Sequence, residues 1–132
     1  MRVRLADTGR DAARVAEIYR PAVEGSFISF EESAPTADEM ADRMRKVLAR
    51  MPWLVVEEDS GVVVGYAYAS PHRERAAYRW SVDISVYVDP AWQRRGVGRL
   101  LYDDLLERLR GHGFVNVYAG VTLPNPASVA LH

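Results

Sequence analysis

The stretch from Trp80 to Arg110 constrains the chain most, because it predicts a strand, a turn, a basic glycine-rich loop and a helix in immediate succession. Residues 80–88 alternate small or polar side chains with β-branched and aromatic ones, which is typical of a strand. Asp89-Pro90 ends it, because proline cannot donate to a ladder. Gln93–Arg99 follows, and leucines at helical spacing come next: Leu101, Leu105 and Leu109.

A glycine-rich loop that opens onto a helix leaves backbone N–H groups unpaired at the positive end of the helix dipole. Such a loop is a potential phosphate site. The dinucleotide-binding fingerprint would need a third glycine where this chain has Leu101, and the Gly-Lys-Ser/Thr of a P-loop is absent. Taken alone, the loop could also be a tight turn with solvated arginines.

The composition indicates an ordinary globular domain spanning residues 1–132, with 48% hydrophobic and 27% charged residues. Seventeen basic and eighteen acidic residues give a net charge of −1, which argues against nucleic acid as the main partner. The sequence has no cysteine, which excludes thiolate metal sites and a cysteine nucleophile, and we expect no metal. Without a membrane-spanning apolar run or a signal peptide, we expect a cytoplasmic protein.

The remaining elements follow from local patterns. Thr8 is expected to cap a first helix, with Asp11 at its third position, that ends at Gly25. Thr36 and Glu39 form a capping box before a second helix, whose methionines we expect in the core. The expected strands are Val3–Leu5, Trp53–Glu57, Val62–Ala69 and Phe114–Val121, and a last helix starts near Asn125. This order predicts an α/β (α+β) domain with a mixed sheet, antiparallel in its middle and closed by a parallel crossover.

The Gln-Arg-Arg-Gly-x-Gly loop and the order of elements resemble the GCN5-related N-acetyltransferases (GNAT), in which this loop holds the pyrophosphate of acetyl-CoA. Other segments resemble the phosphinothricin acetyltransferase branch of that family. They are Phe30–Glu32, Gly65–Tyr68, Arg73–Trp80, Ser85–Val88 and Asn125–His132. The resemblance implies a GNAT fold with helices on both faces of the sheet, and a wedge between the last two strands for the cofactor.

The same resemblance assigns binding residues. For acetyl-CoA it implies the backbone of Val86, Tyr87 and Val88, the loop residues Arg94, Arg95, Gly96, Val97, Gly98 and Arg99, and Asn125 and Ser128. For a small acidic or sulfone-like amino acid it implies Phe30, Arg73, Arg75 and Tyr78. Guanidinium groups suit such an anion because their geometry matches carboxylate and phosphinate oxygens. A solvated charged loop remains the alternative interpretation for Arg73, Arg75 and Tyr78, and a packed loop for Phe30.

Acetyl transfer requires a neutral amine, so a group in the site must accept a proton from the substrate ammonium. Asp83, an acid in the middle of a predicted strand, is our candidate, although it could instead be satisfied by Arg79. The family usually has glutamate there, which places the carboxylate about one bond further out. His132 matches a family histidine near the site, and Tyr87 or Tyr118 could protonate the leaving thiolate.

Relatives in this branch continue into two further strands, so the chain looks incomplete at its C-terminus by comparison. The strand at 114–121 would then have an open edge, from which we expect a homodimer. We therefore weigh two functions. The first is an active N-acetyltransferase for phosphinothricin, methionine sulfone or sulfoximine; the second is a CoA-binding or protein-interaction module with little catalysis. Acetylation of protein N-termini or lysines is less favoured.

Overall fold

The computed structural model describes residues 1–24, 33–71, 81–111 and 116–118. Its elements are, in chain order, β1 (Arg2–Leu5), α1 (Thr8–Glu24), α2 (Ala37–Leu48), β2 (Trp53–Glu57), β3 (Val63–Pro71), β4 (Ser81–Val88), the 3-10 turn η2 (Pro90–Trp92), α3 (Val97–Gly111) and β5 (Asn116–Tyr118). The strands lie side by side in the order β1-β2-β3-β4-β5. Neighbours from β1 to β4 are antiparallel, whereas β5 is parallel to β4. The predicted mixed sheet and parallel crossover are confirmed.

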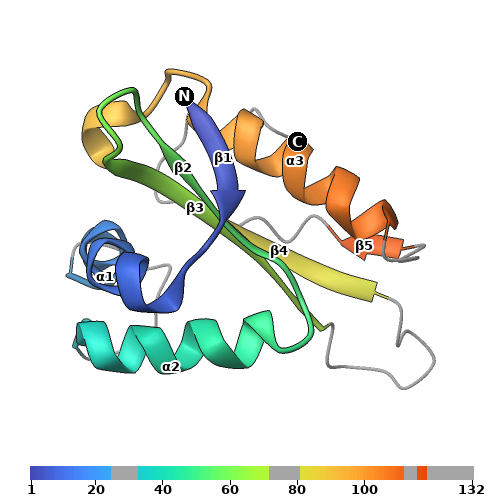
Figure 1. Ribbon diagram of the computed structural model, residues 1–132, viewed down its shortest axis with the longest axis horizontal. Coiled ribbons are helices and arrows are strands. Elements are labelled where there is room, and N and C mark those ends of the chain that lie inside the picture. The colour runs from blue at the N-terminus through green and yellow to red at the C-terminus, as the bar shows by residue number, and fades with distance from the viewer. Residues whose placement is uncertain (25–32, 72–80, 112–115, 119–132) are drawn as a thin grey trace.

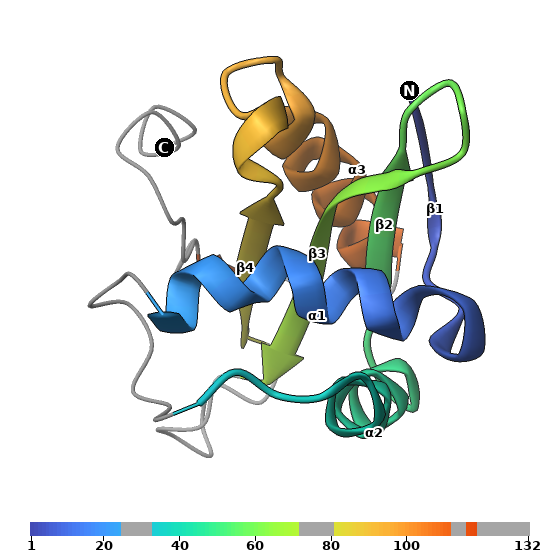
Figure 2. The same ribbon diagram turned by 90° about the vertical axis from the view of Figure 1, so that its left-hand side faces the viewer.

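The sheet is covered on both faces, as Figures 1 and 2 show: α1 and α2 lie on one face and α3 on the other. Side chains of β2 alternate between them, because successive residues of a strand point to opposite faces. Leu54 and Val56 join a core with the leucines of α3, whereas Trp53 and Val55 pack with α1 and α2. The α3 core contains the predicted Leu101, Leu105 and Leu109, all fully buried.

The start of α1 differs from the sequence prediction. Asp7, rather than Thr8, caps the helix: its Oδ1 accepts from the N–H groups of Gly9 and Arg10 at 3.1 and 3.3 Å. Asp11 also binds the cap residue, since its Oδ2 accepts from the N–H of Asp7 at 2.7 Å. Aspartate and threonine are both good caps, and the tertiary position of Asp11 selects the aspartate.

The capping box of α2 is confirmed in both directions. Thr36 Oγ1 accepts from the N–H of Glu39 at 3.1 Å, and Glu39 Oε1 accepts from the N–H of Thr36 at 2.9 Å. The predicted core residues Met40 and Met44 are buried. The expected strands Trp53–Glu57 and Val62–Ala69 are joined by a tight turn, in which the N–H of Gly61 donates to the carbonyl of Glu58 at 2.8 Å.

Gly65 on β3 determines how closely α3 can approach the sheet. A Cβ at this position would lie 2.9 Å from Val97 Cγ1 and 3.2 Å from Leu101 Cδ1, closer than packed carbon atoms tolerate. The register between β2 and β3 shifts at Val56/Glu57, near this glycine. The first turn of α3 therefore rests directly on the β3 backbone, which fixes the position of the loop before it.

Candidate functional site

The candidate site lies where β4 ends and α3 begins. Asp89 stops the strand and caps the following turn, since its Oδ1 accepts from the N–H of Ala91 at 2.8 Å. Its own N–H donates to the carbonyl of Val64 on β3 at 2.9 Å. The Asp89-Pro90 pair thus forms the predicted stop, and the turn leads the chain into the basic loop.

The loop that connects this turn to α3 contains two residues in the left-handed backbone region. Gly96 has a φ of 80°, where glycine is strain-free, but Arg94 has a φ of 67°. A bulky residue rarely adopts that conformation, and such strain is often found at functional sites. The loop is shorter than the sequence indicates, because Val97 to Arg99 already form the first turn of α3.

The start of α3 presents free backbone donors. The N–H of Leu100 donates to the carbonyl of Gly96 at 3.0 Å, and it is the first N–H of the helix with such a partner in the described part of the chain. The N–H groups of Val97, Gly98 and Arg99 come before it in the first turn, where N–H groups have no partner within the helix. Together with the helix dipole, they form the anion site that the sequence predicts.

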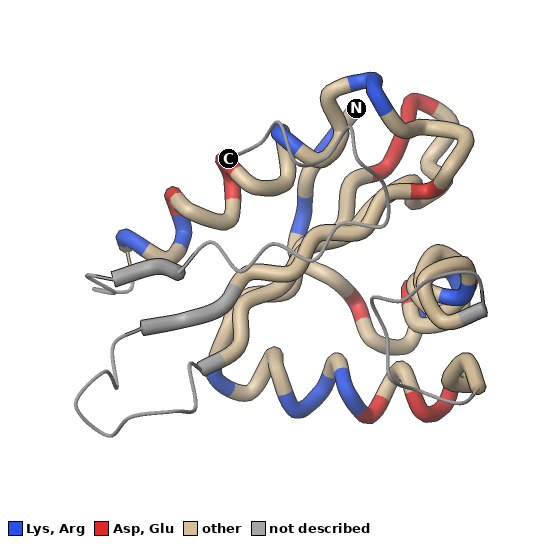
Figure 3. Tube along the Cα trace, turned by 180° about the vertical axis from the view of Figure 1, so that it is seen from behind, with Lys and Arg blue, Asp and Glu red and all other residues tan. Residues whose placement is uncertain are grey.

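Three arginines, Arg94, Arg95 and Arg99, lie in or next to this turn of the chain, and Figure 3 shows basic residues in the loop that leads into α3. Arg94 is exposed and has no acidic partner among the residues that the structure describes. Arg95 lies over the ring of Trp92, with its Cζ 5.1 Å from the ring centroid. Arg99 is exposed and its Nε lies 3.6 Å from Asp103 Oδ2. The local field therefore favours an anion with several charges.

The backbone of β4 offers a second set of polar groups beside this anion site. In an antiparallel ladder, hydrogen-bonded pairs alternate with non-bonded ones. Counting from the Val64–Asp89 bond along the register, the main chain of Tyr87 faces β3, whereas the N–H and C=O groups of Val86 and Val88 face the opposite side. On that side β5 pairs only with Ser81–Asp83 in the described residues.

The Gln93 side chain supports this orientation, because its Nε2 lies 3.4 Å from the carbonyl oxygen of Val88. In the described part of the chain, the N–H and C=O groups of Val86 and the N–H of Val88 have no strand partner on this side. They suit an extended ligand that runs from α3 along β4, whereas the C=O of Val88 already accepts from Gln93. Of the three residues predicted to offer their backbone, Tyr87 differs, because its main chain faces β3. Its ring is buried on the α1 face, where it meets the Tyr19 ring edge-on with centroids 5.2 Å apart.

Other predicted residues lie wholly or partly outside the description. The backbone of Asp83 lies in the middle of the sheet, opposite Ser70 on β3 and Tyr118 on β5. Its side chain lies outside the description. The substrate residues Phe30, Arg73, Arg75 and Tyr78, the cofactor residues Asn125 and Ser128, and the catalytic candidate His132 all lie outside the described residues.

Sequence reasoning missed a stack of aromatic rings on the face covered by α1 and α2. Trp53 stacks on Tyr68 with ring centroids 4.2 Å apart and lies 5.4 Å from Tyr66. Tyr66 is fully buried, which raises the pKa of its phenol well above the ordinary value, so the ring stays neutral. Tyr66 and Tyr68 are two residues apart in β3, and this spacing in the sequence could have indicated that their rings share one face. Their contact with Trp53 depends on the strand register, which the sequence does not show.

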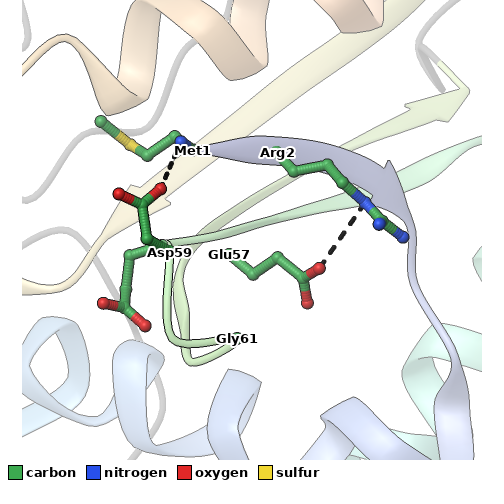
Figure 4. A pocket seen from close by; sticks show the side chains of 6 residues that line it. Met1, Arg2, Glu57, Asp59 and Gly61 are labelled. Atoms are coloured by element: carbon green, nitrogen blue, oxygen red, sulfur yellow. Dashed lines mark hydrogen bonds and ion pairs between the residues drawn. The ribbon is translucent and has the colours of Figure 1, made fainter.

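A separate surface hollow of about 300 Å³ lies at the β1 edge, against the β2–β3 turn (Figure 4). It is lined by Met1, Arg2, Glu57, Glu58, Asp59 and Gly61. Its charged groups pair with one another: the Met1 ammonium lies 3.2 Å from Asp59, and Arg2 Nε lies 3.6 Å from Glu57. It contributes no residue to the site at α3.

Two absences apply to the described residues alone. They contain no cluster of His, Asp or Glu side chains that could hold a metal ion. Within the same ranges, every helix is too short or too polar to cross a membrane.

The chain matches the model of the acetyltransferase (GNAT) family over residues 13–132. It is 42% identical over 125 residues to a phosphinothricin N-acetyltransferase of Streptomyces viridochromogenes, covering 95% of this chain and 68% of the relative. It is 38% identical to an L-methionine sulfoximine/L-methionine sulfone acetyltransferase of Salmonella typhimurium, covering 100% of this chain and 77% of the relative.

Among solved structures, a GNAT superfamily phosphinothricin acetyltransferase from Sinorhizobium meliloti in complex with AcCoA superposes with a TM-score of 0.86 at 35% identity. The superposition covers 99% of this chain and 71% of that one. The family and the fold expected from the glycine loop are therefore both confirmed.

Proposed function

Because the chain belongs to the acetyltransferase (GNAT) family, we propose that it transfers the acetyl group of acetyl-CoA to the amino group of a small amino-acid-like substrate. The names of its relatives favour phosphinothricin, methionine sulfone and methionine sulfoximine as acceptors. A cytoplasmic location and a homodimeric assembly stay predictions from the sequence.

The observation that carries this proposal is the pair of polar surfaces that meet at the end of β4. The N–H groups of Val97, Gly98 and Arg99, which have no partner within the helix, suit a pyrophosphate. The guanidinium of Arg94 adds charge where the described residues supply no counter-ion. The outward main chain of Val86 and Val88 suits an extended amide-containing arm. These groups fit the parts of acetyl-CoA in the order in which that molecule presents them.

Acetyl-CoA supplies an activated thioester, and the chain supplies position and proton transfer. A β4 N–H directed at the thioester carbonyl would polarise it, because backbone donors held in place stabilise charge that develops on oxygen. Asp83 lies further back on β4, and we propose that its carboxylate accepts the proton of the substrate ammonium, directly or through a water molecule. Its shorter side chain, compared with the family glutamate, makes the water-mediated route the better fit.

The residues outside the description keep their proposed roles. Arg73, Arg75, Tyr78 and Phe30 would bind the acidic or sulfone-like side chain of the acceptor, while Asn125 and Ser128 would contact acetyl-CoA. His132 would assist proton transfer. Each assignment rests on the resemblance of these positions to the phosphinothricin acetyltransferase branch, which the comparisons with relatives support at the level of the family.

The test is calorimetric titration of acetyl-CoA into the chain, followed by detection of free CoA thiol with phosphinothricin and methionine sulfone as acceptors. We expect saturable binding and acceptor-dependent thiol release. Binding without turnover on any amine would instead support a CoA-binding module. A folded chain that does not bind acetyl-CoA would refute the proposal.

Gly98→Trp tests the site assignment. The indole would lie in the first turn of α3 and block access to its N–H groups, so we expect acetyl-CoA binding to weaken on the order of 100-fold. Gly111→Trp is the matched control, because Gly111 ends the same helix and a side chain there meets open space. Equal acetyl-CoA affinity in both variants would exclude α3 as the phosphate site.

A further inference from the structure

Arg14 lies on α1, on the face of the sheet opposite α3, and contacts the chain segment that precedes the basic loop at residues 93–96. Its Nε donates to the carbonyl of Val63 on β3 at 2.8 Å, and its Nη2 forms a short ion pair with Asp89 Oδ2. A weaker contact of 3.4 Å links Nη1 to Glu17 on the same helix. Both Arg14 and Asp89 are partly buried, so this ion pair is less screened than one on the open surface.

Asp89 occupies the centre of a set of short hydrogen bonds. One carboxylate oxygen binds Arg14, and the other accepts from the N–H of Ala91 at 2.8 Å. Its backbone N–H is held by Val64, and its carbonyl accepts from the N–H of Trp92 at 2.8 Å. Every hydrogen-bonding group of Asp89 is thus used to orient the turn.

The turn in turn positions the basic loop. Trp92 packs against the core under α3, and its ring lies beneath the guanidinium of Arg95. Two and four residues further on, Arg94 and Gly96 have the left-handed backbone that directs the chain into α3. A change in the direction of Asp89 would therefore be transmitted to the loop through a few rigid residues.

We propose that Arg14 is a positioning residue for acetyl-CoA binding, acting through the carboxylate of Asp89 on the turn and loop that precede α3. This inference rests on the proposed function, since it assigns the loop to acetyl-CoA. Backbone donors bind an anion well only when they converge on it. For reacting groups, a misplacement of about 1 Å can lower the rate on the order of 100-fold, and we expect binding donors to be sensitive to position for the same reason. Arg14 itself contacts no substrate.

The variants that test this role remove the link in steps. Arg14→Met removes both donors but keeps much of the packing, and Arg14→Lys keeps the charge without donating to Val63 and Asp89 together. Asp89→Asn keeps an oxygen for the N–H of Ala91 and loses the ion pair. The double variant Arg14→Met/Asp89→Asn completes a thermodynamic cycle. Arg45→Gln is the matched control, because it breaks an exposed ion pair with Asp42 on α2.

We expect Arg14→Met to raise both the dissociation constant and the KM of acetyl-CoA about tenfold, with kcat and the KM of the amine within about twofold. Arg14→Lys and Asp89→Asn should show the same pattern to a smaller degree. The double variant should bind no more weakly than Arg14→Met, because both changes interrupt one path. Hydrogen exchange of the hydrogen-bonded amides of Ala91, Trp92 and Leu100 should accelerate in the variants and stay unchanged in Arg45→Gln.

A purely structural role gives a different result. Folded variants with lower Tm but an acetyl-CoA affinity within about twofold of the unmodified chain would overturn the inference and leave the proposed function intact. Loss of acetyl-CoA binding by the unmodified chain would instead refute the proposed function. If Arg14→Met fails to fold, Arg14→Lys and Asp89→Asn decide the question by the same criteria.

Discussion

Two arginine-rich regions of this protein use the same side chain for opposite purposes. At the β1 edge, Arg4 donates to both carboxylate oxygens of Asp11 at 2.8 and 2.9 Å and to Glu57 at 3.2 Å. Only 15% of the Arg4 side chain and 2% of the Asp11 side chain are exposed. The hydrogen bonds to Asp11 raise the pKa of Arg4 above its ordinary value. The role of this arginine is therefore structural.

At the start of α3 the arginines are exposed and weakly partnered. Arg94 has a strained backbone and no acidic neighbour among the described residues, and the pair of Arg99 with Asp103 is a solvent-exposed contact of 3.6 Å. Exposed pairs of this kind contribute little to stability. Where the fold provides the counter-ion, arginine is structural; where it does not, arginine is available to an external anion.

The largest effect we expect comes from breaking the first region. Arg4→Met leaves the carboxylate of Asp11 buried, with the N–H of Asp7 as its only hydrogen-bond partner among the described residues. Removing one member of a buried ion pair should lower the free energy of unfolding by about 3 kcal/mol. Urea denaturation measures this change, and acetyl-CoA affinity in the folded variant should not change.

Arg2→Met provides the control, since the Arg2 side chain is 74% exposed and lies 3.6 Å from Glu57. Its unfolding free energy should shift by less than about 0.5 kcal/mol. Equal losses for Arg2→Met and Arg4→Met would mean that burial does not distinguish the two arginines.

In the second region, at the start of α3, we expect a smaller effect, and we expect it on acetyl-CoA binding and not on stability. Arg94→Gln should change the unfolding free energy by less than about 0.5 kcal/mol, because Arg94 has no acidic partner in the described part of the chain. Acetyl-CoA binding should weaken about fivefold, as expected for loss of one exposed charge-assisted contact. The weakening should shrink as salt is added, because exposed charges are screened.

Arg110→Gln, at the opposite end of α3, removes the same charge far from the free N–H groups. Titration calorimetry at low and high salt should show full acetyl-CoA affinity for this variant. If Arg110→Gln and Arg94→Gln weaken binding equally, the interaction reflects net charge and not the loop.

Local patterns were enough to predict most of the fold. The spacing of Leu101, Leu105 and Leu109 gave α3 and its buried face, and Thr36 with Glu39 gave the start of α2. The cap of α1 could not be predicted in the same way, because Asp7 and Thr8 are adjacent and both are favoured N-cap residues. The fold decides between them by placing Asp11 against Arg4.

The site was predictable in composition but not in orientation. The basic glycine loop is visible in the sequence, and so is its place before a helix. Which of Val86, Tyr87 and Val88 turns its main chain away from β3 depends on the strand register, and a shift of one residue would exchange them. The ion pair of Arg14 with Asp89 joins residues 75 positions apart, so no local pattern could reveal it.

The smallest effect we expect is a difference in acid sensitivity between the two regions. Burial alone would raise the pKa of Asp11, but the hydrogen bonds from Arg4 and the N–H of Asp7 outweigh it and hold that pKa below the ordinary 3.8. A carboxylate with a lowered pKa in the folded state stabilises the protein fully above its unfolded pKa, and this stabilisation is lost as the pH falls through the folded pKa.

Urea midpoints from pH 7 down to pH 3 should therefore fall more steeply for the unmodified chain than for Asp11→Asn, and Arg94→Gln should follow the unmodified chain. Parallel acid curves for all three proteins would show that the Arg4–Asp11 pair does not contribute to stability through its charge, and the contrast between paired and free arginines would then depend on packing alone.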